Sequence, residues 1–149
     1  MSRINQTQFF ARPAIDTAKD LLGKIICRKT ESGVIKRLRI LETEAYAGDC
    51  PYVFKETQFY SIGECIAHEN MLIITCFSKE SPDNVVIMSV DGYSGSKAVA
   101  KILDIVSGEV YPHDILWLED DGALVEYVAG ERSFLPDGDL VNFKIKESI

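Results

Sequence analysis

The chain has 149 residues, of which 46% are hydrophobic, so it can bury one sizeable core but is too short for two domains of ordinary size. We therefore expect a single domain over residues 1–149. The net charge of −7 at pH 7 is opposite in sign to the basic footprint of most nucleic-acid-binding proteins. Residues 1–40, however, hold nine Lys or Arg against three acidic residues, so one face can meet an anion. A solvated basic hairpin explains the same charges equally well.

The first elements in chain order are a short helix and a β-hairpin. Pro13 can open a helix, apolar residues recur at helical spacing after it, and Gly23 supplies the stop. The pattern then changes to an apolar strand that begins at Ile25, a turn over residues 31–33, and a second strand that includes Leu38 and Ile40. The hairpin leads directly into residues 42–46.

The remaining elements alternate between strands and one further helix. Residues 48–64 predict an irregular loop because Gly and Pro interrupt any period. Two strands, over about 71–77 and 85–90, flank a turn, and a helix is expected over 97–106. Residues 141–145 alternate in polarity and predict a half-buried terminal strand. The fold class that follows is α+β with a mostly antiparallel sheet.

The cysteines and the N-terminus indicate an intracellular protein. Four cysteines at irregular spacings fit reduced thiols better than disulfides. The pattern Cys65-x-x-His68 followed by Cys76 lacks the fourth ligand and second close pair of a zinc site, so we expect no metal. The N-terminus has no apolar signal core, and no apolar run approaches the roughly 18 residues that cross a bilayer. We expect a cytoplasmic protein with no membrane span.

The segment Glu42-Thr43-Glu44-Ala45-Tyr46 is the strongest candidate for chemistry. If the strand that contains Ile40 continues regularly, Glu42, Glu44 and Tyr46 share one of its faces. Acids that follow apolar residues on one face are typical of the edge of a pocket. The alternative is that the two carboxylates pair with Lys36, Arg37 or Arg39 across the hairpin and do no chemistry.

Three segments together resemble a known enzyme family. They are Phe9-Phe10-Ala11-Arg12-Pro13, Leu21-Leu22-Gly23-Lys24 and Glu42-Thr43-Glu44-Ala45-Tyr46. In order and spacing they are similar to the opening of the alkyladenine (3-methyladenine) DNA glycosylases. The likeness is strong over residues 9–48 and thins afterwards. It implies a partly barrel-like antiparallel sheet with a few flanking helices, and an enzyme that removes damaged purines from DNA.

The resemblance assigns roles to individual residues. It implies that Glu44 activates the attacking water and that Tyr46 stacks on the flipped base. It places Leu72 where the family has a stacking Tyr and Thr75 where it has a DNA-intercalating Tyr. Further contacts to DNA are expected from the basic hairpin and from a possible phosphate site at a helix start: Lys36, Arg37, Arg39, Ser96 and Lys97. No metal and no organic cofactor are implied, and we expect a monomer whose partner is damaged duplex DNA.

The sequence departs from the family where the pocket should be completed. The family's His is absent from residues 48–56, and its active-site Arg falls near Met88. Tyr52, Phe54 or Tyr60 could supply the missing aromatic surface. Three hypotheses remain. The first is a monofunctional glycosylase for alkylated or deaminated purines, and the second is a catalytically degenerate relative that binds DNA or a small molecule. The third is an unrelated interaction protein in which the motif is accidental.

Overall fold

The computed structural model describes residues 2–46, 61–68, 71–76, 83–91, 93–94, 96–103, 110–129 and 140–146. The described helices are α1 (Gln6–Phe9), α2 (Ala14–Leu21) and α3 (Ser96–Ile102). The described strands are β1 (Ser2–Arg3), β2 (Ile25–Lys29), β3 (Ile35–Tyr46), β4 (Cys65–His68), β5 (Met71–Cys76), β6 (Asp83–Val90), β7 (Tyr93–Ser94), β8 (Val110–Tyr111), β9 (Leu116–Asp120), β10 (Tyr127–Ala129) and β11 (Leu140–Ile145).

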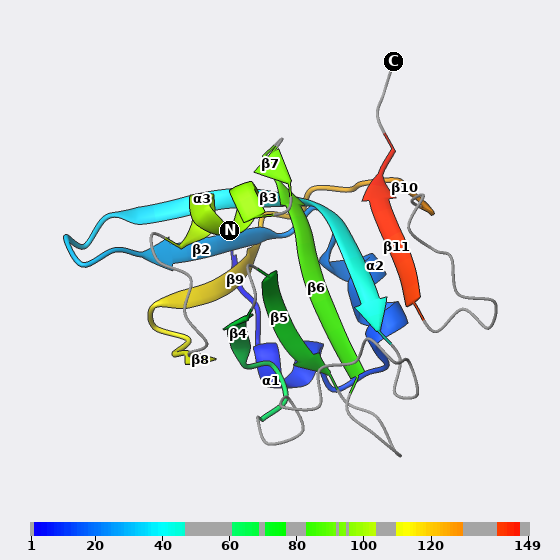
Figure 1. Cartoon of the computed structure of the whole chain (residues 1–149), viewed down its shortest axis with the longest axis horizontal. Coiled ribbons are helices and arrows are strands. Elements are labelled where there is room, and N and C mark those ends of the chain that lie inside the picture. The colour runs from blue at the N-terminus through cyan, green and yellow to red at the C-terminus, as the bar shows by residue number, and fades with distance from the viewer. Residues whose placement is uncertain are drawn as a thin grey trace.

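The strands form one antiparallel sheet that curls into a half-barrel (Figure 1). Its main order is β1-β9-β2-β3-β6-β5-β4-β8, with β7 beside β6 and the pair β10–β11 attached to β3. β3 organises the sheet, because its first part pairs with β2 and its second part pairs with both β6 and β11. The expected α+β class with a mostly antiparallel, partly barrel-like sheet is confirmed.

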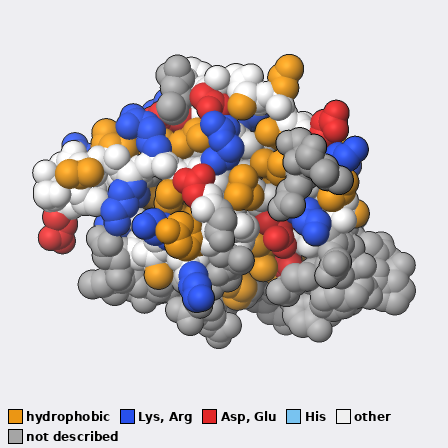
Figure 2. All heavy atoms as spheres, turned by 90° about the horizontal axis from the view of Figure 1, so that it is seen from above, with side chains coloured by type: hydrophobic (Ala, Val, Ile, Leu, Met, Phe, Trp, Pro, Cys, Tyr) orange, Lys and Arg blue, Asp and Glu red, His pale blue; other side chains and the backbone are white. Residues whose placement is uncertain are grey.

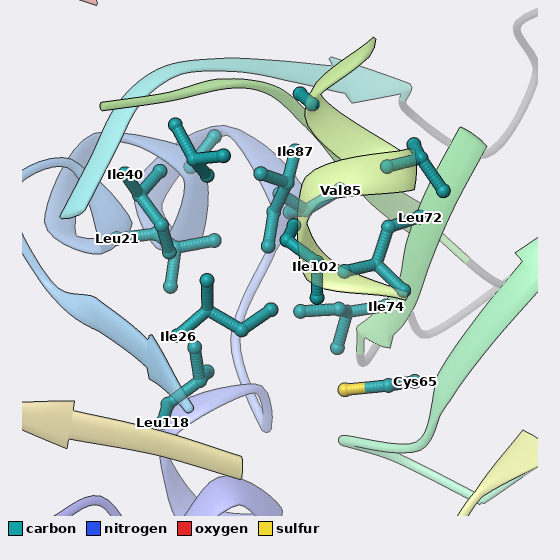
Figure 3. Close-up of a cluster of buried hydrophobic side chains, with 14 of the residues drawn as sticks. Leu21, Ile26, Ile40, Cys65, Leu72, Ile74, Val85, Ile87, Ile102 and Leu118 are labelled. Atoms are coloured by element: carbon teal, nitrogen blue, oxygen red, sulfur yellow. The ribbon is translucent and has the colours of Figure 1, made fainter. Parts of the chain in front are cut away.

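The main core lies on the concave side of the half-barrel. Apolar side chains from the sheet meet those of α2 and α3 there, and the labelled residues of Figure 3 converge on one volume. Ile26 and Leu118 come from β2 and β9, whereas Leu72 and Ile74 come from β5. Burial of large aliphatic side chains, each contributing about 1.5–3 kcal/mol, holds the two halves of the sheet together.

Helix α2 forms where the sequence predicts it. Pro13 occupies the N-cap with φ −54°, and Ala14, Ala18 and Leu21 are buried on one side. Leu22 is already extended after the helix, and Gly23, with φ +82°, takes the left-handed position of the turn that the Lys24 N–H closes on the Leu21 carbonyl. The Thr43 hydroxyl of β3 donates to the Ala18 carbonyl at 2.9 Å, so the helix is fixed to the strand that carries Glu44.

The predicted hairpin, central strands and terminal strand are confirmed. β2 and β3 pair antiparallel around a turn, β5 pairs with β6, and β11 pairs with β3. The second predicted helix is present as α3, although residues 104–106 of the prediction lie outside the described residues. The sequence patterns did not predict β4, α1 or the short strands at the sheet edges, because two to four residues are too few for a visible period.

The assumption of a regular β3 is wrong. The β3–β6 register shifts between Ile40 and Glu42 and again between Glu42 and Thr43. Ile40 and Thr43 both face the core side, which an uninterrupted two-residue alternation cannot produce. Glu44 and Tyr46 therefore face away from the main core, opposite to Ile40 rather than in line with it. The irregularity lies on both sides of Glu42, so the alternation of side chains is interrupted at the first residue of the motif.

Some sequence predictions fall outside the described residues. They include most of the loop over 48–64, with Tyr52, Phe54 and Tyr60, and much of the turn between the strands predicted at 71–77 and 85–90. Across the described residues, no helix combines the length and apolar character that a membrane crossing requires.

Candidate active site around Glu44

Glu44 and Tyr46 form a buried pair on the convex side of β3. Glu44 is 0% exposed and Tyr46 is 4% exposed. The Tyr46 hydroxyl donates to Glu44 Oε2 at 2.6 Å, a short bond of the kind that phenols make with carboxyl groups. Two residues apart on one strand, the side chains lie on the same face, as the sequence predicts. The bond fixes the direction of the carboxyl group.

The neighbouring strands surround this pair with two rows of side chains. Glu44 lies opposite Asn142 of β11 and Val86 of β6, and Val86 lies opposite Ile73 of β5. In the next row, Tyr46 lies opposite Asn84, which lies opposite Thr75. We call this set the Glu44 face: Glu44, Tyr46, Ile73, Thr75, Asn84, Val86 and Asn142.

An aliphatic floor lies within the Glu44 face. Ile73, Val86 and Tyr46 form a buried cluster of their own, separate from the main core, with Met71 and Met88 packed against it. Met88 stands where the resemblance places an arginine. The described part of this face thus combines the carboxyl group of Glu44 with an apolar surface, and its other polar side chains are uncharged hydroxyls and amides.

The other carboxylate of the motif is held separately. Asn142 Nδ2 donates to Glu42 Oε2 and to the Thr43 carbonyl, each at 3.0 Å. Asn142 is 1% exposed, so these bonds are shielded from water. Glu42 is thereby oriented toward β11, and the two acids of the motif have different partners.

The arginines of the hairpin pair with acids on β9 and just beyond it, not with the motif. Arg37 Nε lies 3.2 Å from Glu119, and Arg39 Nη2 lies 2.5 Å from Asp121. Hydrogen bonding from Arg39 holds the pKa of Asp121 at about 2, and that of Arg39 is raised in turn. The hypothesis that these two arginines neutralise Glu42 and Glu44 therefore has no support.

The basic hairpin does not form an uninterrupted cationic surface. Arg37 and Arg39 alternate with core-facing Leu38 and Ile40, so they lie on the same side of β3 as Glu44, whereas Lys36 lies on the other side. Viewed from above, Lys and Arg side chains are interspersed with acidic and apolar ones (Figure 2). Any phosphate that binds here must compete with the ion pairs.

The remaining predicted site residues are not all brought to Glu44. Leu72 is fully buried in the main core and points into it (Figure 3), on the opposite side of β5 from the Glu44 face. The residue of β5 that faces Glu44 is Ile73. Thr75 is on the Glu44 face but only 3% exposed, so it is not placed to insert between base pairs. Ser96 and the exposed Lys97 begin α3, which packs on the concave side.

Two residues of the site, Asn84 and Asn142, were not found from the sequence. Asn84 was interpreted as part of a turn, and Asn142 as a solvent-facing position of an alternating strand. Both are buried, at 0% and 1% exposure. The alternation of polar and apolar residues did not reveal that Asn142 belongs to the site, because the register that sets it opposite Glu44 depends on long-range pairing.

Comparison with known proteins gives a partial but consistent match. Residues 8–55 match the family model described as methylpurine-DNA glycosylase (MPG). A protein of Streptomyces avermitilis is 54% identical over 41 residues, which cover 28% of this chain and 19% of the relative. One of Psychrobacter cryohalolentis is 45% identical over 53 residues, covering 33% and 25%.

A longer match extends beyond the N-terminal segment. A protein of Clostridium novyi is 29% identical over 106 residues, which cover 61% of this chain and 51% of the relative. All three relatives carry the name "Putative 3-methyladenine DNA glycosylase". The matches thus span from about a fifth to about half of the relatives' own length. The matched segment 8–55 contains Glu44 and Tyr46, whereas Thr75, Asn84 and Asn142 lie outside it.

Proposed function

Because residues 8–55 match the methylpurine-DNA glycosylase family, we propose that the chain is a DNA glycosylase that excises alkylated or deaminated purines from duplex DNA. The main support for this proposal is the position of one carboxyl group. A carboxyl group of the family's matched segment, Glu44, lies buried on an apolar face, oriented by the Tyr46 hydroxyl at 2.6 Å.

The proposed reaction uses a water molecule as the nucleophile. The damaged nucleotide leaves the base stack, and Glu44 accepts a proton as the water oxygen bonds to C1′. The N-glycosidic bond breaks, and its electron pair leaves with the base. A cationic alkylated purine departs as a neutral molecule, whereas a neutral purine such as hypoxanthine takes up a proton as it departs, which balances the proton that Glu44 accepts from water. The carboxylate also stabilises the positive charge that develops on the sugar. Because no amine attacks C1′, the product is an abasic site in an intact strand, and the scheme requires no metal or organic cofactor.

Burial of Glu44 sets a condition on this reaction. Since Glu44 and Tyr46 have almost no exposed surface, substrate must enter by displacing protein atoms that cover the Glu44 face. A base already extruded from the duplex supplies apolar surface that can replace those contacts. The ring of Tyr46 and the floor of Ile73 and Val86 are the surfaces we propose for it.

The proposed DNA path follows the convex side of β3. The irregularity around Glu42 puts Glu44 on the same side of β3 as Arg37 and Arg39, so phosphates near these arginines would belong to the strand whose base approaches Glu44. Lys36, Ser96 and Lys97 lie on the other side of the sheet and remain proposed contacts only apart from this path. Duplex binding that weakens with salt, and weakens further when Lys36, Arg37 and Arg39 are neutralised, supports this path. Duplex binding that does not weaken when Lys36, Arg37 and Arg39 are neutralised excludes this path.

A second candidate is a family member that binds without cleaving. Met88 in place of an arginine, and an aliphatic floor in place of aromatic stacking surfaces, favour it. Such a protein would bind a damaged duplex or a small flat ligand at the Glu44 face and release no base.

A single-turnover assay separates the candidates. Duplexes carrying hypoxanthine, ethenoadenine or a methylated purine are incubated with excess protein, and release of the free base is followed. We expect release by the wild type and its loss in Glu44→Gln, which keeps an oxygen that can accept the Tyr46 hydrogen bond. Glu42→Gln is the matched control, because Glu42 lies two residues away but is bound to Asn142. Base release by E44Q at the wild-type rate would overturn the assignment of Glu44.

A further inference from the structure

Thr75 has a feature that distinguishes it from Thr43, the other buried threonine among the described strands of the sheet. Its side chain is almost completely buried, at 3% exposure, and Oγ1 has no hydrogen-bond partner in the part of the chain that the structure describes. Its backbone is already engaged, because its N–H donates to the Glu64 carbonyl and its own carbonyl accepts from Gly63. A buried hydroxyl without a partner destabilises a folded protein, so its presence in this position requires an explanation.

Thr43 shows what a purely structural threonine does in the same fold. It is 0% exposed, faces the opposite side of the sheet and donates its hydroxyl to the Ala18 carbonyl at 2.9 Å. That bond joins β3 to α2. Thr75 makes no comparable connection, although it is nearly as well buried.

The position of Thr75 relates it to Glu44. Thr75, Asn84 and Tyr46 form one cross-strand row, and Glu44 begins the adjacent row. Two strand spacings separate β3 from β5, a distance of about 10 Å. Between the carboxyl and the hydroxyl lies the aliphatic floor of Ile73 and Val86. A flat ring system resting on this floor can reach Glu44 at one end and Thr75 at the other.

We propose that Thr75 is a specificity-determining residue whose hydroxyl hydrogen-bonds the polar edge of the purine held on the Glu44 face. The inference rests on the proposed function and extends it. A hydroxyl can donate to a ring nitrogen or carbonyl oxygen and can accept from an amino group, so it suits purines that differ at this edge. Asn84, directly opposite Thr75 and fully buried, is the neighbouring amide at the same end of the face. Hydrogen bonding replaces the aromatic surfaces as the means of recognition.

Removing the hydroxyl of a threonine changes stability in opposite directions, depending on whether that hydroxyl bonds within the folded protein or is kept for a ligand. Thr75→Val keeps the shape of the side chain and removes the hydroxyl, whereas Thr75→Ser keeps the hydroxyl. Thr43→Val is the matched control. We expect T75V to unfold at a temperature equal to or above that of the wild type, because an unsatisfied polar group is removed, and T43V to unfold at a lower temperature.

Recognition is measured separately from stability. Free hypoxanthine is titrated into each protein by calorimetry, and the protein concentration for half-maximal single-turnover release is measured with a hypoxanthine duplex. We expect T75V to weaken both by about three- to tenfold, the loss of one neutral hydrogen bond. T75S should restore them, and T43V should leave them unchanged.

The outcomes distinguish this inference from the proposed function. A lower unfolding temperature for T75V, like that of T43V, shows a structural role and overturns the inference. Equal hypoxanthine affinity in T75V and wild type also overturns it, as does the absence of binding to wild type. If hypoxanthine binds, T75V weakens it, and no duplex releases its base, then the inference stands and catalysis fails.

Discussion

Replacing Tyr46 by Phe isolates the hydrogen bond that orients Glu44. The ring and its packing against Ile73 and Val86 remain, and the donor to Glu44 Oε2 at 2.6 Å is removed. A hydrogen bond contributes about 0.5–1.5 kcal/mol between neutral groups and about 1.5–3 kcal/mol when one partner is charged. Because both side chains are buried and water cannot replace the phenol, we expect Y46F to lower the free energy of unfolding by about 1–3 kcal/mol.

Equilibrium urea denaturation at pH 7 measures this difference. With a slope of about 2 kcal/mol per molar urea, the midpoint should fall by about 0.5–1.5 M. Tyr127→Phe is the control, because Tyr127 is 44% exposed on β10 and should change stability by less than about 0.5 kcal/mol. In the single-turnover assay, Y46F should also slow base release by about tenfold or more, since the carboxyl group loses its fixed orientation. If Y46F is as stable as Y127F, the phenol–carboxyl bond does not organise the site.

Three further predictions concern the scaffold. Gly63→Ala should destabilise the protein by at least about 1 kcal/mol more than Gly33→Ala, as measured by urea midpoints. Both glycines have φ near +85°, but an added Cβ at Gly63 would lie 2.8 Å from a backbone oxygen of α1, whereas an added Cβ at Gly33 would meet open space. Equal destabilisation by the two substitutions would contradict the contact. Glu119 accepts from an indole N–H and an arginine, which lowers its pKa below the ordinary 4.5. Its ionised form therefore stabilises the fold at neutral pH, and this contribution is lost as pH falls through the lowered pKa. Wild-type stability should decrease more between pH 7 and pH 3 than that of Glu119→Gln, and parallel pH profiles would refute this. Burial raises the pKa of both Cys27 and Cys65 to about 12, so iodoacetamide at pH 8 should alkylate these thiols only after the protein is denatured. Mass spectrometry detects the alkylation, and its appearance on either residue in the native protein would contradict their burial.

Local patterns were sufficient to predict the elements around the motif. Pro13 and Gly23 bound α2, and alternating apolar residues indicated the paired strands that form the sheet. These features depend on residues close together in sequence, so a single chain reveals them. The sharing of one face by Glu44 and Tyr46 followed from the same reasoning.

The face to which that pair belongs could not be predicted. Two register shifts, one on each side of Glu42, interrupt the alternation of side chains along β3, and nothing in the sequence marks their position. The resemblance put Leu72 at the site, whereas the structure places Ile73 there and Leu72 in the core. Asn142 was missed because its role depends on pairing with a strand about a hundred residues away.

Release of a free purine base from damaged duplex DNA, compared between wild type and E44Q, decides whether Glu44 carries out the proposed hydrolysis. We expect wild type to release the base and to leave an uncut strand with an abasic site, which later breaks under alkali, and we expect E44Q to release none. Failure of folded wild type to release a base from the hypoxanthine, ethenoadenine and methylpurine duplexes would contradict it, as would equal release by E44Q.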